Sequence, residues 1–175
     1  MKKKVGIIGA GNIGCAIAKG MLAQKVMSPS KLYLSRRRNR LLDEQKKQGL
    51  TVTDNHSLVS ECDIIILAVL PGQAKEVLLD LIPLLEGSNK ILVSVFSATR
   101  LNELKEWTGK QAEVVRIMPN IAAEYGAGMT CIAGEREQAV EEVKSLFDPL
   151  GNTMIIQEKL MPAATILAAC GIAFF

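Results

Sequence analysis

The chain has 175 residues, of which 49% are hydrophobic and 22% charged, so a disordered or collagen-like chain is excluded. A net charge of +3 is too small to indicate nucleic-acid binding. The four cysteines form no C-x-x-C pair and there is one histidine, so we expect reduced thiols and no metal site. We find no targeting signal and no membrane span, and therefore expect a cytoplasmic protein.

Short apolar runs alternate with amphipathic patterns along the chain. Strands are predicted at 4–8, 32–34, 51–53, 64–69, 90–95, 114–118, 129–133 and 153–156, and helices at 12–24, 39–48, 57–62, 74–85, 100–107 and 136–146. Ser57 and Thr99 are the expected helix caps in this pattern. Such alternation predicts a doubly wound, mainly parallel α/β sheet with helices on both faces.

A glycine-rich turn follows the first predicted strand and opens the first helix. Residues 9–14 read G-A-G-N-I-G, which matches the G-x-G-x-x-G pattern of Rossmann-type dinucleotide sites. In such a turn Gly9 permits the sharp bend, Gly11 lets a pyrophosphate approach the backbone, and Gly14 lets the helix pack closely. Asn12 and Ile13 begin the helix, whose free N–H groups attract anions. The alternative is a glycine turn with a purely structural role.

The residues after the second strand indicate which dinucleotide would bind. An NAD site usually has an acidic residue here, whereas this chain continues with Ser35, Arg36, Arg37 and Arg38. A hydroxyl and guanidinium groups suit a 2′-phosphate, so we predict a preference for NADP(H) over NAD(H). The alternative is that the arginines form only a solvated start of the next helix.

Further contacts are expected at the carboxyl ends of the other parallel strands, where ligands bind in this fold class. The candidates that follow the third, fourth and fifth strands are Asn55, Val69, Leu70, Pro71, Ser97 and Ala98. Asn55 is either an adenosine contact or a turn residue. His56 is expected at the surface or beside the adenine, away from any reacting atom.

Three motifs in the second half of the chain resemble those of pyrroline-5-carboxylate reductases. They are R-x-M-P-N at 116–120, G-x-G-M-T at 126–130, and an E-x-x-x-x-A-x-T…G-x-A-F run from Glu158 to Phe174. Together with the glycine turn, the resemblance covers residues 4–175.

This family reduces the C=N bond of Δ1-pyrroline-5-carboxylate with NAD(P)H and gives L-proline. The resemblance implies that Met118, Pro119 and Asn120 lie near the nicotinamide and the substrate ring, and that Cys170 and Gly171 belong to the substrate loop. A protonated imine is already electrophilic, so placement of the two reactants suffices, and we assign no catalytic side chain.

The resemblance also implies a division of the chain into two parts. Residues 1–157 are expected to form the NADP-binding domain, and residues 158–175 the first segment of a helical domain that forms a homodimer or larger homo-oligomer. The last 16 residues carry no charge. We therefore expect this chain to be a piece that binds NADPH but reduces the imine poorly.

Some residues depart from the family pattern. Leu70 stands where the family often has lysine, and Ile121 and Ala122 stand where it usually has Thr-Pro. Ala168 and Cys170 stand where the substrate loop of the family has two serines. These departures leave two alternatives open: a dinucleotide-binding module without catalysis, and an imine reductase with a different substrate.

Overall fold

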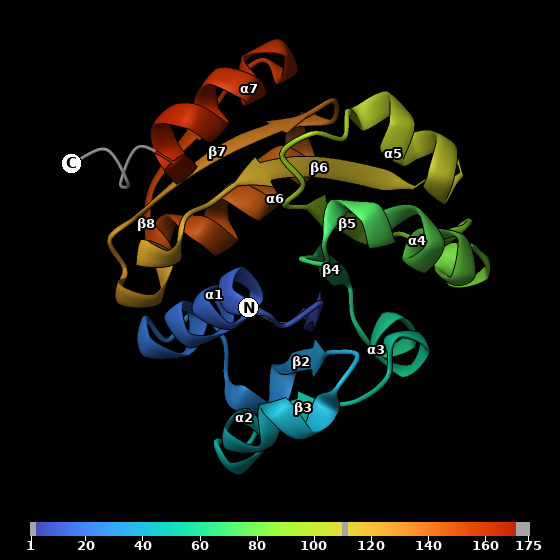
Figure 1. Cartoon of the computed structure of the whole chain (residues 1–175), viewed down its shortest axis with the longest axis vertical. Helices are drawn as coiled ribbons and strands as arrows, with labels where there is room; N and C mark the ends of the chain where they lie inside the picture. Colours follow the sequence, from blue (N-terminus) through green and yellow to red (C-terminus); the bar gives the residue numbers. More distant parts are fainter. Residues whose placement is uncertain (1–2, 110–111, 171–175) are drawn as a thin grey trace.

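The structure is a computed structural model that describes residues 3–109 and 112–170. Within these ranges the strands form one eight-stranded sheet in the order β3-β2-β1-β4-β5-β6-β7-β8 (Figure 1). The strands are β1 (Val5–Ile8), β2 (Leu32–Ser35), β3 (Thr51–Val52), β4 (Ile64–Leu67), β5 (Ile91–Ser94), β6 (Glu113–Met118), β7 (Gly128–Gly134) and β8 (Gly151–Ile155). The β6–β7 pairing is antiparallel, and the other pairings among these strands are parallel.

Helices cover both faces of the sheet, which confirms the predicted doubly wound α/β class (Figure 1). The helices are α1 (Asn12–Ala23), α2 (Asp43–Lys47), α3 (Asn55–Glu61), α4 (Pro71–Leu85), α5 (Leu101–Thr108), α6 (Glu137–Phe147) and α7 (Met161–Ala164). Helices α1 and α6 pack on one face, and α3, α4 and α5 pack on the other. Helix α7 covers the end of β6 and part of β7, and a π-helical turn, η6 (Thr165–Cys170), continues it.

The predicted helix starts needed correction. Helix α4 begins at Pro71 rather than at position 74, and the segment 39–48 opens with a 3-10 turn before α2. The cap of α3 is Asp54, whose carboxylate accepts the N–H of Ser57, so Ser57 is not the cap. The N-cap residue of α5 is Arg100, whose backbone N–H donates to the Glu103 carboxylate, and not the buried Thr99. The pattern of apolar residues locates a helix but not the residue whose backbone turns into it.

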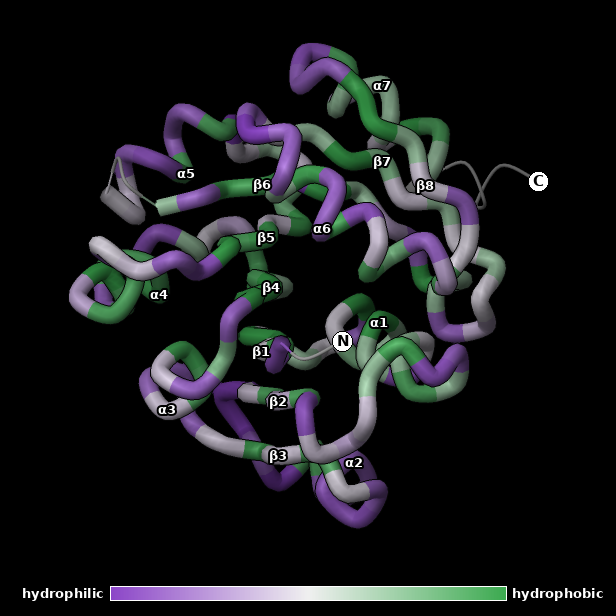
Figure 2. The backbone as a smooth tube through the Cα atoms, turned by 180° about the vertical axis from the view of Figure 1, so that it is seen from behind, coloured by the Kyte–Doolittle hydropathy of each residue, from purple (hydrophilic) through white to green (hydrophobic). Residues whose placement is uncertain are grey.

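The core is built almost entirely from aliphatic side chains, as expected from an aromatic content of 4%. Phe96 and Phe147 are the large aromatic side chains among its fully buried members. Hydrophobic residues concentrate on the central strands β4 and β5 (Figure 2). Among the described helices, none is both long and apolar enough to cross a membrane.

Helix α1 lies unusually close to the 3-10 turn η3 (Ile121–Tyr125), which follows β6. A Cβ atom added at Gly20 of α1 would lie 2.2 Å from the carbonyl oxygen of Ala123. This close approach ties the first helix of the chain to the segment after Asn120, and a side chain at position 20 has no space.

The substitution Gly20→Ala is therefore expected to lower the free energy of unfolding by about 1–3 kcal/mol, the usual cost of overpacking. The control is Gly72→Ala in the first turn of α4, where an added Cβ meets nothing within 4 Å. The control should leave the free energy unchanged or raise it by up to about 1 kcal/mol, because alanine favours helix. Urea unfolding measures both, and equal effects of the two substitutions would contradict the packing argument.

Candidate functional site

The order of the strands creates a crevice at one edge of the sheet. From β1 the chain proceeds outward through β2 and β3, and it then returns to β4, on the other side of β1, before continuing outward through β5 and β6. The carboxyl ends of β1 and β4 therefore form a topological switch point, where open α/β sheets bind their ligands.

The glycine turn at the end of β1 is packed on two sides and open on the third. Gly9 has φ +86°, and a Cβ atom there would lie 2.6 Å from the backbone nitrogen of Val69. A Cβ atom at Gly14 would lie 2.9 Å from the carbonyl oxygen of Gly9, whereas one at Gly11 would meet only that oxygen, at 3.9 Å. The open side at Gly11 leads onto the first turn of α1, so the turn has room for a pyrophosphate.

The same turn is fastened to β2, the strand that carries the next candidates. The backbone N–H groups of Gly9 and Ala10 both donate to the carbonyl oxygen of Ser35, at 3.0 Å. At the start of α1, Asn12 is exposed and Ile13 packs partly against the core. The first helical turn has no intrahelical acceptor for its N–H groups, which makes it suited to an anion.

Two candidates from different strands contact each other. The buried Ser35 donates its hydroxyl to Oδ1 of Asn55, over 2.6 Å. Asn55 is the first residue of α3, so it is a helix-start residue that the chain holds against the end of β2. The structure thus brings Ser35 and Asn55 together, and their role towards an adenosine stays a prediction.

A cavity of about 320 Å³ lies beside the end of β2. Its lining residues are Arg36, Arg37, Arg38 and Leu41. Sequence reasoning missed Asn39, whose Oδ1 accepts the backbone N–H of Arg36 at 2.9 Å and whose Nδ2 donates to the carbonyl of Thr53 at 3.3 Å. Asn39 therefore fastens the arginine segment to the end of β3.

The candidates after β4 and β5 border the other half of the crevice. Val69 is half-buried against the core, Leu70 is largely exposed and Pro71 starts α4. Ser97 and Ala98 are exposed in the loop between β5 and α5. All of them sit at the carboxyl edge of the sheet, as the doubly wound topology requires.

The candidates for substrate contact lie at the end of β6. Met118, Pro119 and Asn120 are buried, and Nδ2 of Asn120 donates to the carbonyl of Ala168 in η6 at 2.9 Å. Oδ1 of Asn120 is buried and has no hydrogen-bond partner within the described part of the chain. Gly171 and the side chain of Cys170 lie outside what the structure describes, so these two assignments stay predictions.

Two residues named above only as members of sequence motifs form a partly buried ion pair beside this segment. Nη1 of Arg116 lies 2.8 Å from Oε1 of Glu158, and the Arg116 side chain is almost fully buried. The sequence already contained a signal for this pair, since Arg116 is a charged residue inside a predicted buried strand. Burying a charge without a partner is costly, so a partner was to be expected.

Other polar residues have structural partners elsewhere. His56 is exposed, and its Nε2 lies 3.4 Å from Oδ2 of Asp80 on the outer side of α4. Glu124 pairs with Lys19 of α1 at 2.9 Å. Burial raises the pKa of the Cys15 thiol, while the nearby charge of Arg36 acts in the opposite direction.

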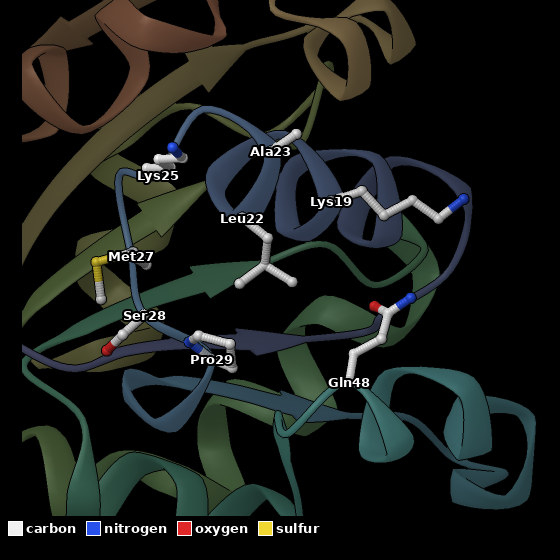
Figure 3. Close-up of a pocket in the computed structure, with 8 residues that line it drawn as sticks. All are labelled: Lys19, Leu22, Ala23, Lys25, Met27, Ser28, Pro29 and Gln48. Carbon is white, nitrogen blue, oxygen red and sulfur yellow. The ribbon is translucent and has the colours of Figure 1, made fainter.

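A second hollow, of about 660 Å³, lies at the opposite end of α1 (Figure 3). Leu22 and Pro29 give it an apolar floor, and Lys19 and Lys25 stand at its margin. It is formed by the last turns of α1 and the connection to β2, so it is separate from the crevice at the carboxyl ends of the strands.

The family model described as "NADP oxidoreductase coenzyme F420-dependent" matches residues 4–98. The chain belongs to this family. Its membership and the open glycine turn together support a nicotinamide dinucleotide as the cofactor. The matched region contains the turn, the arginine segment and the loop after β5.

Three known proteins are similar to this chain over nearly its whole length. The chain is 35% identical over 98% of its length to pyrroline-5-carboxylate reductase 1 of Dictyostelium discoideum and 34% identical over 98% to pyrroline-5-carboxylate reductase of Methanosarcina acetivorans. The crystal structure of Plasmodium falciparum pyrroline carboxylate reductase with NADP bound superposes with a TM-score of 0.89 at 28% identity, over 99% of this chain. The resemblance inferred from the motifs is confirmed. The chain spans 34%, 65% and 64% of the lengths of these three proteins.

The cap of α3 predicts how the stability of this protein responds to acid. The backbone N–H and hydroxyl of Ser57 donate to the Asp54 carboxylate and lower its pKa from 3.8 to about 2. Because the folded-state pKa is depressed, the stabilisation is complete above pH 4 and is lost as the pH falls from about 4 to about 2. Wild type should therefore exceed Asp54→Ala in urea midpoint at pH 7, and the difference should shrink between pH 4 and pH 2. A difference that stays constant over that range would contradict the assignment.

Proposed function

We propose that this protein is an NADPH-dependent reductase that converts Δ1-pyrroline-5-carboxylate into L-proline, the last step of proline biosynthesis. The observation that carries the proposal is the similarity to pyrroline-5-carboxylate reductases along 98% of the chain. The open glycine turn at the carboxyl edge of the sheet supports it, since that geometry suits a dinucleotide. The substrate is accordingly a small cyclic imine.

The adenosine half of the cofactor is proposed to bind along the ends of β1, β2 and β3. The segment 9–14, with Asn12 and Ile13 in the first helical turn, would hold the pyrophosphate. Arg36 and Arg37 would hold the 2′-phosphate, Ser35 would face it while its hydroxyl donates to Asn55, and Asn55 would lie beside the ribose. The arginine-lined cavity next to Ser35 supports this placement, because guanidinium groups bind phosphate in a bidentate manner.

The nicotinamide half is proposed to lie between the β4 and β5 ends. The segment 69–71 and the exposed Ser97 and Ala98 would line its path, and Met118, Pro119 and Asn120 would border the substrate ring. When bound, the reduced nicotinamide supplies the hydride for the C=N bond. The residues of this chain orient the two reactants, and the buried Met118 keeps water away from the ring.

The segment from Glu158 onward is proposed to begin a separate helical domain after a cofactor domain at 1–157, and to form a homo-oligomer. Support comes from its helical structure and from the exposed apolar side chains of Ile166 and Leu167. The cytoplasmic location stays a prediction.

A related imine reductase is the second candidate function. Alanine at 168 and cysteine at 170, where the resembled family has serines, remove two hydroxyls that would bind a substrate carboxylate. An imine without a carboxylate would then be the preferred substrate.

The cofactor proposal predicts tighter binding of NADPH than of NADH, by at least about ten-fold, since a charge-assisted hydrogen bond contributes about 1.5–3 kcal/mol. Arg36→Ala and Arg37→Ala should each weaken NADPH binding by about ten-fold and leave NADH binding unchanged. Fluorescence titration measures both affinities. Arg40→Ala is the matched control, because Arg40 is exposed nearby and does not line the cavity. Equal affinity of the wild-type chain for the two cofactors would contradict the proposal.

The activity proposal is tested on the product of the complete natural gene. Purified protein with NADPH and Δ1-pyrroline-5-carboxylate should lose absorbance at about 340 nm and form L-proline in a one-to-one ratio, as hydride transfer to the C=N bond requires. The control substrate is 1-pyrroline, which has the same ring without the carboxylate. Faster reduction of 1-pyrroline would favour the second candidate function, and binding of NADPH without reduction of either imine would favour a non-catalytic module.

A further inference from the structure

Arg116 is a charged residue in the interior of β6, between β5 and β7. Its side chain is 4% exposed. A guanidinium group at such a depth needs partners, because its loss of hydration is otherwise uncompensated. Nη1 and Nη2 of Arg116 are paired, whereas Nε has no hydrogen-bond partner within the described part of the chain. The partners of Arg116 therefore show what the residue holds in place.

The guanidinium group joins the loop after β5 to the segment before α7. Its Nη2 donates to the carbonyl oxygens of Phe96 and Ser97, at 3.2 and 3.1 Å, and its Nη1 donates to Oε1 of Glu158 at 2.8 Å. The same Oε1 accepts the backbone N–H of Leu101 at 2.6 Å. Arg116 and Glu158 thus hold the loop between β5 and α5 at both of its ends.

Alternation along β6 extends this connection towards the candidate substrate site. Alternate residues of a strand share one face of the sheet, as Arg116 and Met118 do in β6, and Asn120 follows two residues after the last residue of the strand. Met118 packs in one cluster with Met161 and Ala164 of α7, and Asn120 donates to η6 at 2.9 Å. The R-x-M-x-N spacing therefore attaches one continuous helical segment to the sheet at three successive points.

We propose that Arg116 and Glu158 are positioning residues, which set the backbone of Ser97 and Ala98 against the nicotinamide end of the bound cofactor. The inference rests on the proposed function. Ser97 is held through its own carbonyl, and Ala98 lies between that carbonyl and the N–H of Leu101 held by Glu158, so the loop has little freedom to shift. A lysine cannot replace the arginine, because it lacks the planar fork that reaches two carbonyls and a carboxylate together.

The test compares two ligands that share the adenosine end. The substitution Arg116→Lys should weaken NADPH binding by about ten-fold, since charge-assisted hydrogen bonds are lost, and should change the affinity for adenosine 2′,5′-bisphosphate by less than about two-fold. Isothermal titration calorimetry measures both. The fluorescence of bound NADPH, which reports the surroundings of the nicotinamide, should move towards its value in water.

The control is Arg136→Lys, an exposed arginine that pairs with Glu113 at 3.2 Å and should affect neither ligand. Circular dichroism and the urea midpoint check folding. If Arg116→Lys does not fold, Glu158→Gln replaces it in the test. Glu158→Gln should also weaken NADPH binding, by a smaller factor, and leave the affinity for adenosine 2′,5′-bisphosphate nearly unchanged. Unchanged NADPH affinity, or equal losses for both ligands, would overturn the positioning role. A wild-type chain that binds neither ligand would instead refute the proposed function, and the positioning role with it.

Discussion

Gly9 stands where four elements of the structure meet. Its N–H donates to the carbonyl of Ser35 at the end of β2, and its missing side chain leaves room for the backbone of Val69 after β4. Its carbonyl oxygen lies directly against Gly14 of α1. Only glycine combines φ +86° with such crowding without strain. The adjacency of β1, β2, β4 and α1 at the carboxyl edge therefore depends on this residue, and the proposed cofactor site is the surface that the packing leaves open.

The strands were predictable to within about two residues because parallel strands buried on both faces form continuous β-branched runs. Helix starts were less predictable, since a cap depends on where the backbone turns and not on the apolar period. Asp54 and Arg100 occupy the N-cap positions of α3 and α5, although Ser57 and Thr99 have the expected residue types nearby. The antiparallel pairing of β6 with β7 also has no signature in either strand alone, because burial patterns do not record direction.

The candidate site was predictable in its positions and not in its contacts. The carboxyl-edge rule places Ser35 and Asn55 at the same edge, but their hydrogen bond requires the order of β2 and β3 and the start of α3. The contacts of Arg116 were harder to predict, since its partners come from the loop after β5 and from Glu158, 42 positions later. A charge in a buried strand signals that partners exist without identifying them.

The two halves of the crevice are held by different physical means. At the proposed adenosine end, exposed arginines project from a short turn that Asn39 fastens through its side chain, and exposed charges contribute little to the stability of the fold. At the proposed nicotinamide end, the buried Arg116 and the partly exposed Glu158 hold the loop, and loss of Glu158 leaves the Arg116 charge without its carboxylate partner in the interior. Under the proposed function, substitutions in the arginine turn therefore change the dinucleotide preference while the sheet stays intact. The proposed placement of the nicotinamide depends on the folding of β6 and of the segment that begins at Glu158, so under this proposal it does not vary separately from them.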